Sequence, residues 1–377
     1  MDGNDKPTVV IVENGLGFTG AFKAILQIAE DLSDQYRFVF VIPKDSDAVA
    51  YLRDKNIKFY AIPYFPLQKQ FKSILLYIPG LLLSAIRLKR IIIKEQASIL
   101  HANDIYNLST IIVKLFYPRV KLITHVRILK ASFPPVIYGI WTRLTQRFSD
   151  IIVGVSEVAL SPFGRDNRIR LIYDGVFQTE KHPYNYEVHP STINLLYLAN
   201  YIQGKGQDLA IESFALVCKQ KRNVRLTFVG DTFKLPANEK FKLSIIKKAR
   251  ELDVADSVVF KEFSVDVEKE FKESSIFLNL SEAESFSFTC LESLYYGIPC
   301  IATASGGPQE ILNNGEYGVL IYERNKHKIA YEILKLINDP DQRLLFSKKG
   351  RLYARKVFSP KNTSDRVREI YSQVRSY

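Results

Sequence analysis

Short apolar runs rich in β-branched and aromatic residues alternate with longer segments of helical periodicity along the chain. This alternation is typical of α/β proteins that are built on parallel sheets. In the first half it predicts strands near Thr8–Glu13, Phe38–Ile42, Lys58–Ile62, Ser98–His101, Lys121–His125, Asp150–Val155 and Arg168–Ile172. In the second half it predicts strands near Ile193–Leu198, Val224–Val229, Ser257–Phe260, Ile276–Leu280, Pro299–Ala302 and Gly318–Ile321.

A polar segment without periodicity, residues 178–191, separates these two series, and we interpret it as a linker. The predicted domains are residues 1–177 and residues 192–358. A terminal helix over residues 359–377 should follow and pack back toward the N-terminal domain by one apolar stripe. We therefore expect an α/β protein with two doubly wound, Rossmann-like domains facing a cleft. Ligands in such domains bind outside the carboxyl ends of the strands.

Positive charge is concentrated in one part of the sequence. The 377 residues include 52 Lys and Arg against 40 Asp and Glu, and the formal net charge is +12. The stretch from Tyr51 to Arg147 alone holds sixteen Lys and Arg and three acidic residues. Such a distribution predicts an anionic partner that meets one face of the N-terminal domain. The alternative is a set of solvated helix faces.

An apolar run beside basic residues indicates what this partner is. Residues 73–86 carry no charge, and Arg87, Lys89, Arg90 and Lys94 follow at once. The run is short for a membrane span, so we interpret it as a helix lying on an anionic membrane surface. A buried core helix with a basic edge is the alternative. The three cysteines lack CxxC spacing and indicate a reduced compartment. We expect a cytoplasmic protein, peripheral at the inner face of the cytoplasmic membrane.

The first predicted strand leads into a glycine-rich loop, Gly15-Leu-Gly17-Phe-Thr-Gly20, which precedes an amphipathic helix. Glycines in this place let backbone amides and a helix N-terminus approach a phosphate or a sugar. The same pattern occurs in dinucleotide-binding folds, which also require an acid after the second strand, and Asp45 is available. An NAD-dependent oxidoreductase is therefore an alternative.

Asp45-Ser-Asp47 also spells the DxD pattern with which some sugar transferases hold a divalent metal on a diphosphate. Here it precedes a helical stretch, where Asp and Ser are ordinary capping residues, and we favour that interpretation. The five histidines have no HxH or HxxxH spacing. We therefore predict no metal site.

Two carboxylates, Glu284 and Glu292, stand eight positions apart across a predicted strand-to-helix loop, and the helix should stop at Gly297. On a single helix they would be about 12 Å apart. That distance is close to the span of a diphosphate with a sugar on each side. Carboxylates so placed accept hydrogen bonds from sugar hydroxyls.

With the downstream Gly297-Ile-Pro299, this pattern resembles the EX7E signature of family 4 of the retaining glycosyltransferases, which have the two-domain GT-B architecture. Four further motifs of the second half resemble that family in the expected order: Leu198-Ala-Asn200 with Gly204-Lys205-Gly206, Phe228-Val-Gly230-Asp231, Ala304 through Glu310, and Asn314-Gly315-x-x-Gly318. Looser likenesses in the first half are Gly17-Phe-Thr-Gly20-Ala21, His101, Thr124-His125, Val155-Ser156 and Asp174-Gly175-Val176.

The resemblance implies a role for each matching residue. Lys205 would hold the donor diphosphate, Glu292 the ribose hydroxyls and Glu284 the transferred sugar. Histidine 125 would face that sugar, so the implied catalytic residues are Glu284, His125 and Lys205. The implied donor contacts are Gly17, Gly20, Asn200, Lys205, Gly230, Asp231, Phe286, Ser287, Phe288 and Glu292. Asp104 and Arg127 are weaker candidates for acceptor or phosphate contacts.

The implied reaction is sugar transfer from a UDP-sugar or GDP-sugar donor, with retained configuration, without a metal ion or other cofactor. The acceptor would be lipid-linked or a cell-surface polysaccharide such as lipopolysaccharide or capsule. The sequence departs from the family at Asn200, where an arginine is usual, at Asp174 in place of Asn, and at Glu262 in place of Gly. Lys234 or Arg127 would replace the missing arginine. A non-catalytic protein that binds a sugar nucleotide, or that binds nucleic acid through the basic stretch, is a further alternative. The partners we expect include no nucleic acid.

Overall fold

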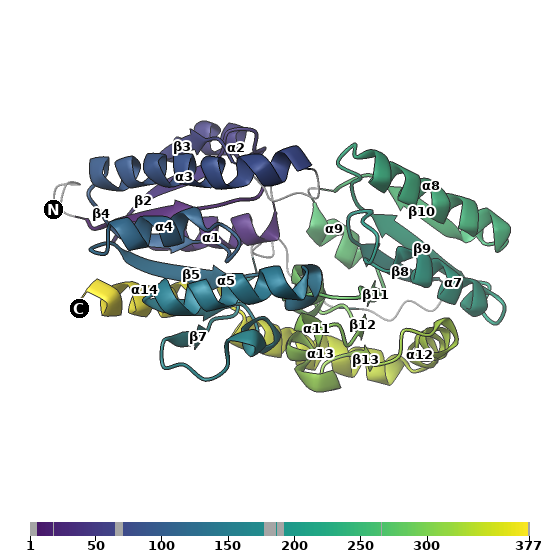
Figure 1. Ribbon diagram of the computed structural model, residues 1–377. Coiled ribbons are helices and arrows are strands. Elements are labelled where there is room, and N and C mark those ends of the chain that lie inside the picture. Colours follow the sequence, from purple (N-terminus) through teal and green to yellow (C-terminus); the bar gives the residue numbers. More distant parts are fainter. Residues whose placement is uncertain are drawn as a thin grey trace. The chain divides into compact units, whose positions relative to one another are not determined.

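The computed structural model describes residues 6–17, 19–64, 71–176, 186, 192–264 and 266–375, without the side chains of residues 71–76. The chain divides into two compact units (Figure 1). The first unit comprises Met1–Phe177 together with Pro360–Tyr377, and the second comprises Gln178–Ser359. The predicted linker, residues 178–191, lies outside the described residues except for Tyr186.

The first unit is built on a parallel sheet with the strand order β3-β2-β1-β4-β5-β6-β7. The order reverses direction between β1 and β4, so loops that follow these neighbouring strands diverge and leave room for a ligand. Every residue of β1 is buried, as expected for a central strand covered on both faces. The strands are β1 (Thr8–Val12), β2 (Arg37–Pro43), β3 (Phe59–Ile62), β4 (Ala97–Ala102), β5 (Lys121–Val126), β6 (Ile151–Gly154) and β7 (Ile169–Leu171).

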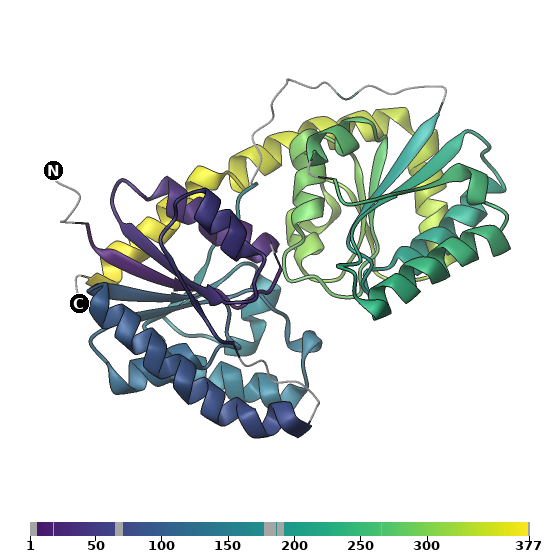
Figure 2. The same ribbon diagram turned by 90° about the horizontal axis from the view of Figure 1, so that it is seen from above.

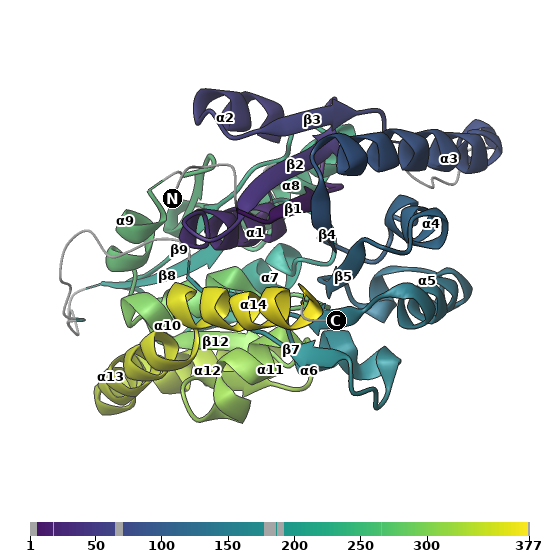
Figure 3. The same cartoon turned by 90° about the vertical axis from the view of Figure 1, so that its left-hand side faces the viewer.

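Two hydrophobic clusters cover the two faces of this sheet. One is formed with α1, α2 and α14, and the other with α3 and α4. The helices of the unit are α1 (Gly20–Asp31), α2 (Ala48–Asp54), α3 (Phe71–Lys94), α4 (Ser109–Phe116), α5 (Pro135–Phe148), α6 (Glu157–Leu160) and α14 (Pro360–Arg375). Figure 3 shows α1 and α14 on one side of the strands and α3, α4 and α5 on the other.

The last helix belongs to the first unit although it follows the second in the sequence. Helix α14 packs against α1 (Figure 2). It buries Val367, Ile370, Tyr371 and Val374, whose helical spacing is visible in the sequence. Burial of this apolar stripe stabilises a helix that is otherwise polar.

The second unit repeats the design with the strand order β10-β9-β8-β11-β12-β13. Its strands are β8 (Ile193–Leu198), β9 (Val224–Val229), β10 (Val258–Lys261), β11 (Ile276–Asn279), β12 (Cys300–Thr303) and β13 (Val319–Ile321). Its helices are α7 (Gln207–Cys218), α8 (Pro236–Glu251), α9 (Val267–Lys272), α10 (Phe288–Tyr296), α11 (Gly307–Ile311), α12 (Lys326–Asn338) and α13 (Pro340–Val357). Two doubly wound α/β domains confirm the predicted fold class, while the cleft between them stays a prediction.

Candidate functional site

Lys205 and Glu284 meet at the carboxyl ends of β8 and β11 in the second unit. The Lys205 Nζ donates a hydrogen bond to Glu284 Oε1 at 2.8 Å, and the Ser281 hydroxyl donates to the same oxygen at 2.8 Å. The side chain of Lys205 is 32% exposed and that of Glu284 is 15% exposed. Two opposite charges are therefore held together where an incoming ligand reaches them.

The Lys205 loop is shaped by its glycine neighbour. Gly206 has a φ of +84°, and a Cβ there would come within 2.2 Å of the Leu280 carbonyl oxygen. Only glycine combines this backbone conformation with so close an approach. The buried Tyr197 hydroxyl donates to the Lys205 carbonyl and accepts the N–H of Leu280. These contacts tie the Lys205 loop to the end of β11.

The Glu284 loop is held by the segment that follows β12. The Glu284 N–H donates to the Ser305 carbonyl at 2.9 Å, and the Gly307 N–H donates to the Glu284 carbonyl at 2.8 Å. A Cβ on Gly307 would lie 2.1 Å from the Phe286 oxygen, so the backbones pass too closely for any side chain. Gly307 belongs to the motif from Ala304 through Glu310, and this motif therefore positions Glu284.

Helix α10 begins after Glu284, so the two carboxylates do not share a helix. Ser287 has a left-handed φ of 82° and stands before the first helical residue, Phe288. The Asn279 side-chain amide donates to the Ser287 hydroxyl at 3.0 Å. Glu292 lies within the helix and is half-buried. The distance of a single-helix arrangement does not apply, and the donor contacts of Phe286, Ser287, Phe288 and Glu292 stay predictions.

The ends of β8 and β9 bring Asn200, Gly230 and Asp231 together, as their place after adjacent strands implies. The Asp231 N–H donates to Asn200 Oδ1 at 3.1 Å. A Cβ on Gly230 would lie 2.1 Å from the Ala199 oxygen, which explains the glycine. Asn200 thus holds neighbouring backbone, and its predicted contact with the donor stays a prediction.

Arg324 is a cation at this edge of the sheet that the motifs do not include. It follows β13, and its Nη1 contacts Glu282 Oε1 at 2.9 Å while Nη2 donates to the Leu280 carbonyl at 3.3 Å. The Glu282 N–H in turn donates to the Gly204 carbonyl, next to Lys205. The signal available in the sequence is an arginine shortly after a predicted strand, because all carboxyl ends of a parallel sheet meet at one edge.

In the first unit, His125 lies at the end of β5 and is completely buried. Its ring stacks on that of His101 with 5.6 Å between centroids, and His101 Nδ1 shares a hydrogen bond of 2.7 Å with the Tyr371 hydroxyl on α14. Burial lowers the pKa of His101 to about 3 and the pKa of His125 well below its usual value, and the Arg127 charge acts in the same direction. Both rings are therefore neutral at physiological pH.

The surroundings of Arg127 argue against the prediction that it replaces the phosphate-binding arginine missing at Asn200. Its side chain is 3% exposed, its Nη1 lies 2.5 Å from Asp174 Oδ2, and its Nε donates to Asn103 Oδ1 at 2.7 Å. The guanidinium is thus committed inside the first unit. Asp104 is also buried, and it accepts the N–H groups of Ile105 and Arg127. Burial raises the pKa of Asp104 to about 7, and its predicted contact with an acceptor stays a prediction.

The glycine loop before α1 differs from a dinucleotide site in one respect. The buried carboxylate of Glu13 accepts the N–H of Gly15 at 2.7 Å and that of Asn14 at 2.9 Å. A pyrophosphate bound to these amides would have to displace a carboxylate. Gly20 begins α1, and the Thr19 hydroxyl caps this helix by accepting the Phe22 N–H. The donor contacts of Gly17 and Gly20 stay predictions.

At the Asp45-Ser46-Asp47 sequence, the capping contact comes from the middle residue. The Ser46 hydroxyl accepts the Ala48 N–H at the start of α2, whereas the Asp47 side chain makes no capping hydrogen bond. Capping by Asp or Ser was the favoured interpretation, and the Ser46 contact confirms it. Within the part of the chain that the structure describes, no group of three or more metal-binding side chains occurs.

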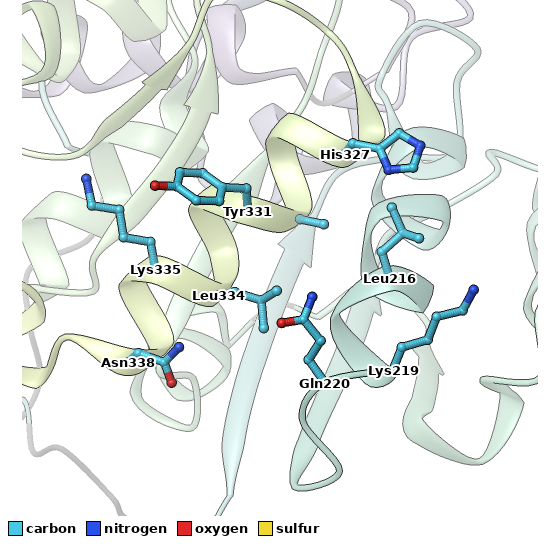
Figure 4. Close-up of a pocket in the computed structure, with 9 residues that line it drawn as sticks. Leu216, Lys219, Gln220, His327, Tyr331, Leu334, Lys335 and Asn338 are labelled. Atoms are coloured by element: carbon cyan, nitrogen blue, oxygen red, sulfur yellow. The ribbon is translucent and has the colours of Figure 1, made fainter.

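A pocket of about 490 Å³ lies between α7 and α12 of the second unit (Figure 4). Leu216, Lys219, Tyr331 and Lys335 are among its lining residues. The pocket contains none of the predicted site residues, which follow the carboxyl ends of the strands. We therefore do not place the donor there.

The match to a known protein family falls within the second unit. Residues 180–353, just under half of the chain, match the family model of glycosyl transferases group 1. N-acetyl-alpha-D-glucosaminyl L-malate synthase of Bacillus anthracis is 25% identical over 189 residues, which are 50% of this chain and 48% of that protein. The putative glycosyltransferase EpsD of Bacillus subtilis is 27% identical over 197 residues, 51% of this chain and 48% of that protein. The matches thus span about half the length of these relatives.

Solved structures resemble the whole chain in fold. HepE of Anabaena, crystallised with UDP and glucose, covers 97% of this chain and 99% of its own with a TM-score of 0.79 at 17% identity. The lipopolysaccharide outer core galactosyltransferase WaaB gives a TM-score of 0.75 at 16% identity, with 97% of this chain and 99% of its own covered. At such identities the likeness shows the fold alone. The chain therefore has the fold of these proteins, and its residues 180–353 match the family model of glycosyl transferases group 1.

Proposed function

We propose that this protein is a retaining glycosyltransferase that moves a sugar from a UDP-sugar or GDP-sugar donor to a lipid-linked or cell-surface polysaccharide acceptor, without a metal ion. The observation that carries the proposal is the contact of 2.8 Å between Lys205 and Glu284 at the carboxyl ends of the strands. The match to glycosyl transferases group 1 over residues 180–353 supports it, since both residues lie in that region.

The ion pair suggests how the donor binds. Lys205 and Glu284 contact each other at 2.8 Å, so a donor that binds both has to offer each of them a further or a new partner. The diphosphate supplies anionic oxygens for Lys205, and hydroxyls of the sugar supply hydrogen bonds to the Glu284 carboxylate. Little electrostatic energy is lost in the exchange, because a partly exposed ion pair stabilises the fold by only about 0–1 kcal/mol.

The same residues account for the reaction. As the bond from the anomeric carbon to the diphosphate breaks, negative charge develops on the leaving phosphate oxygens, and Lys205 offsets it. The acceptor oxygen attacks from the side on which the phosphate leaves, which retains the configuration, and the phosphate takes the acceptor proton. Glu292 orients the donor through the ribose hydroxyls. We propose that no protein group forms a covalent intermediate.

The decisive experiment compares nucleotides and nucleotide sugars by thermal shift. UDP or GDP, and one of their sugars, should raise the unfolding temperature, whereas NAD should leave it unchanged. A rise with NAD alone would favour the oxidoreductase instead. Slow hydrolysis of the bound nucleotide sugar, followed by mass spectrometry, separates an enzyme from a protein that only binds the donor.

We further propose that the first unit binds an anionic membrane surface through α3, α4 and α5. Helices α3 and α4 are neighbours, as are α4 and α5. They expose Ile86 on α3, Phe116 at the end of α4 and Val136 on α5, by 51%, 66% and 75%. Arg90 and Lys94 are exposed on α3 as well. Apolar and basic side chains on the same helices are typical of a surface that enters the headgroup region of a membrane.

This proposal concerns a surface and not a span. No helix in the described residues has the length and hydropathy to cross a membrane. The test is sedimentation with vesicles of phosphatidylglycerol and phosphatidylcholine at low salt, with pure phosphatidylcholine vesicles as the control. Binding to the anionic vesicles that weakens with salt supports the proposal, and absence of binding contradicts it.

A further inference from the structure

We infer that the buried Arg127–Asp174 ion pair fixes the tautomer of His125, so that this ring presents its Nε2–H as a hydrogen-bond donor to the transferred sugar. Arg127 and Asp174 are then positioning residues. The sugar as recipient rests on the proposed function, whereas the tautomer itself does not. A resemblance to glycosyltransferases assigns no role to this ion pair.

The argument begins with the three directions in which the Arg127 guanidinium points. Its Nη1 contacts Asp174 Oδ2 at 2.5 Å, its Nε donates to Asn103 Oδ1 at 2.7 Å, and its Nη2 lies 3.5 Å from His125 Nδ1. A guanidinium carries hydrogen-bond donors and no acceptor. A proton on the His125 nitrogen that faces it would meet a second donor, so this contact favours a lone pair on Nδ1. In a neutral imidazole the proton then resides on Nε2.

Electrostatics selects the same tautomer as the hydrogen bond. A proton on Nδ1 would point at a positive charge inside a buried site, where such repulsion is weakly screened. Burial, together with the charge of Arg127, holds the pKa of His125 well below its usual value, so the ring has a single proton to place. The positive neighbour favours the lone pair on Nδ1 and leaves that proton on Nε2.

The Nε2–H has no partner among the residues that the structure describes, although the His125 ring is completely buried. Leaving a buried donor unpaired is destabilising. The ring cannot turn to avoid this cost, because His101 stacks on it and Tyr371 holds His101. A fixed and unsatisfied donor is suited to a ligand that brings an acceptor oxygen, and a sugar hydroxyl is one.

The departure of this sequence from the family at position 174 fits the inference. The resemblance implies Asn there, whereas this chain has Asp174. An asparagine could not neutralise Arg127, and an unpaired guanidinium in this buried place would be strongly destabilising. Arg127 and Asp174 therefore form one unit, and it is their joint presence that allows a cation to lie beside His125.

The first experiment reads the tautomer directly and needs no donor. In protein labelled with ¹⁵N-histidine, long-range proton–nitrogen NMR spectra distinguish Nδ1–H from Nε2–H, and loss of one signal set in His125→Gln assigns the residue. We expect His125 to be the Nε2–H tautomer. The double variant Arg127→Met with Asp174→Asn removes both charges together, and we expect its His125 to shift toward Nδ1–H. An Nδ1–H signal in the unmodified protein overturns the inference.

The second experiment measures sugar transfer with the donor found by the thermal screen. A glutamine amide nitrogen lies near the position of a histidine Nε2, whereas an asparagine amide nitrogen lies near Nδ1. His125→Gln should therefore keep more activity than His125→Asn. The double variant should lose about 100-fold in kcat, the usual effect of removing one donor in the transition state. Within the double variant, His125→Gln should restore part of that loss, which a general loss of stability would not allow.

The outcomes separate the two proposals. If no nucleotide sugar binds, the proposed function fails while the NMR result still decides the tautomer. If the tautomer changes in the double variant and kcat does not fall, the positioning role is wrong. Equal activity of His125→Gln and His125→Asn also contradicts it.

Discussion

Lys205 and Glu284 show that a residue already paired with one side chain has to exchange that partner when it binds a ligand. Each has a predicted role toward a donor, and in the structure the two side chains form an ion pair with each other. The pair could not be anticipated from the sequence, because 79 positions separate the two residues and their contact depends on how two loops are held. The same holds for Arg127 with Asp174 and for Arg324 with Glu282. A single sequence indicates which residue types follow the strands, but not which of them face each other.

We predict that Lys205→Ala and Glu292→Ala each abolish donor turnover while the unfolding temperature stays close to that of the unmodified protein. The residues contribute to the bound state, and the partly exposed ion pair of Lys205 adds only about 0–1 kcal/mol to stability. Transfer assays and thermal unfolding check both statements. Lys247→Ala and Glu251→Ala, on the exposed side of α8, are matched controls that should keep full activity. Full activity of Lys205→Ala or Glu292→Ala would sink the site assignment.

We predict that Asp104→Asn stabilises the protein above neutral pH. Burial raises the pKa of Asp104 to about 7, although the N–H groups of Ile105 and Arg127 favour the carboxylate. The pKa of an aspartate in the unfolded chain is about 4. The protonated Asp104 carboxyl therefore stabilises the fold fully below about pH 4, and this stabilisation is lost as the pH rises to about 7. The free energy of unfolding of the variant should therefore rise relative to that of the unmodified protein between pH 5 and pH 8, which urea unfolding measures.

The amide keeps an oxygen that can accept the same two backbone N–H groups, so Asp104→Asn changes the charge and little else. Asp256→Asn, at an exposed position, is the matched control. Parallel pH profiles for Asp104→Asn and the unmodified protein would contradict the buried state of this carboxyl.

At the scale of elements, the pattern of apolar residues predicts the strands well and the helix ends less well. Strands β8 and β9 have the predicted bounds, because each is a short, mainly apolar segment between polar loops. Helix α3 continues past the predicted apolar run to Lys94, since Leu88, Ile91 and Ile92 are buried between its charged residues. The start of α10 was not predictable, because its left-handed residue is Ser287 and not a glycine.

We predict that Gly206→Ala lowers the free energy of unfolding of the second unit far more than Gly315→Ala does. Both glycines have positive φ, at +84° and +97°, so both substitutions incur the conformational cost of about 1–2 kcal/mol. Only at Gly206 would the new methyl group also meet the Leu280 backbone, at 2.2 Å, whereas the nearest atom at Gly315 is 4.0 Å away. Urea unfolding should show a loss of about 3 kcal/mol or more for Gly206→Ala. Equal losses for the two variants would refute the close approach of these loops.

At the scale of the whole molecule, the excess of positive charge lies in the first unit, whereas the proposed diphosphate site belongs to the second. Sixteen Lys and Arg fall between Tyr51 and Arg147. The sequence alone locates this charge, but only the structure shows that Ile86, Phe116 and Val136 are exposed on the helices that carry it. Hydrophobic spacing could not separate an exposed apolar face from a buried one, because both follow the same helical period.

We predict that the double variant Ile86→Ser with Phe116→Ser binds anionic vesicles about 10- to 100-fold more weakly. Each large apolar side chain that enters a nonpolar environment contributes roughly 1.5–3 kcal/mol, and these two enter only part of the way. Leu243→Ser with Leu352→Ser, two exposed leucines of the second unit, is the matched control. Equal vesicle binding by the two double variants would place the membrane surface elsewhere.

The return of α14 to the first unit has a consequence for how the protein is made. A ribosome emits the second unit, residues 178–359, before Pro360–Tyr377. At about 5–20 residues per second, the nascent first unit waits on the order of tens of seconds for its last helix. Until then the apolar surface that receives Val367 and Ile370 is uncovered, and His101 lacks its hydrogen bond to Tyr371. The interval before translation ends is therefore when this chain is most open to chaperones and to aggregation.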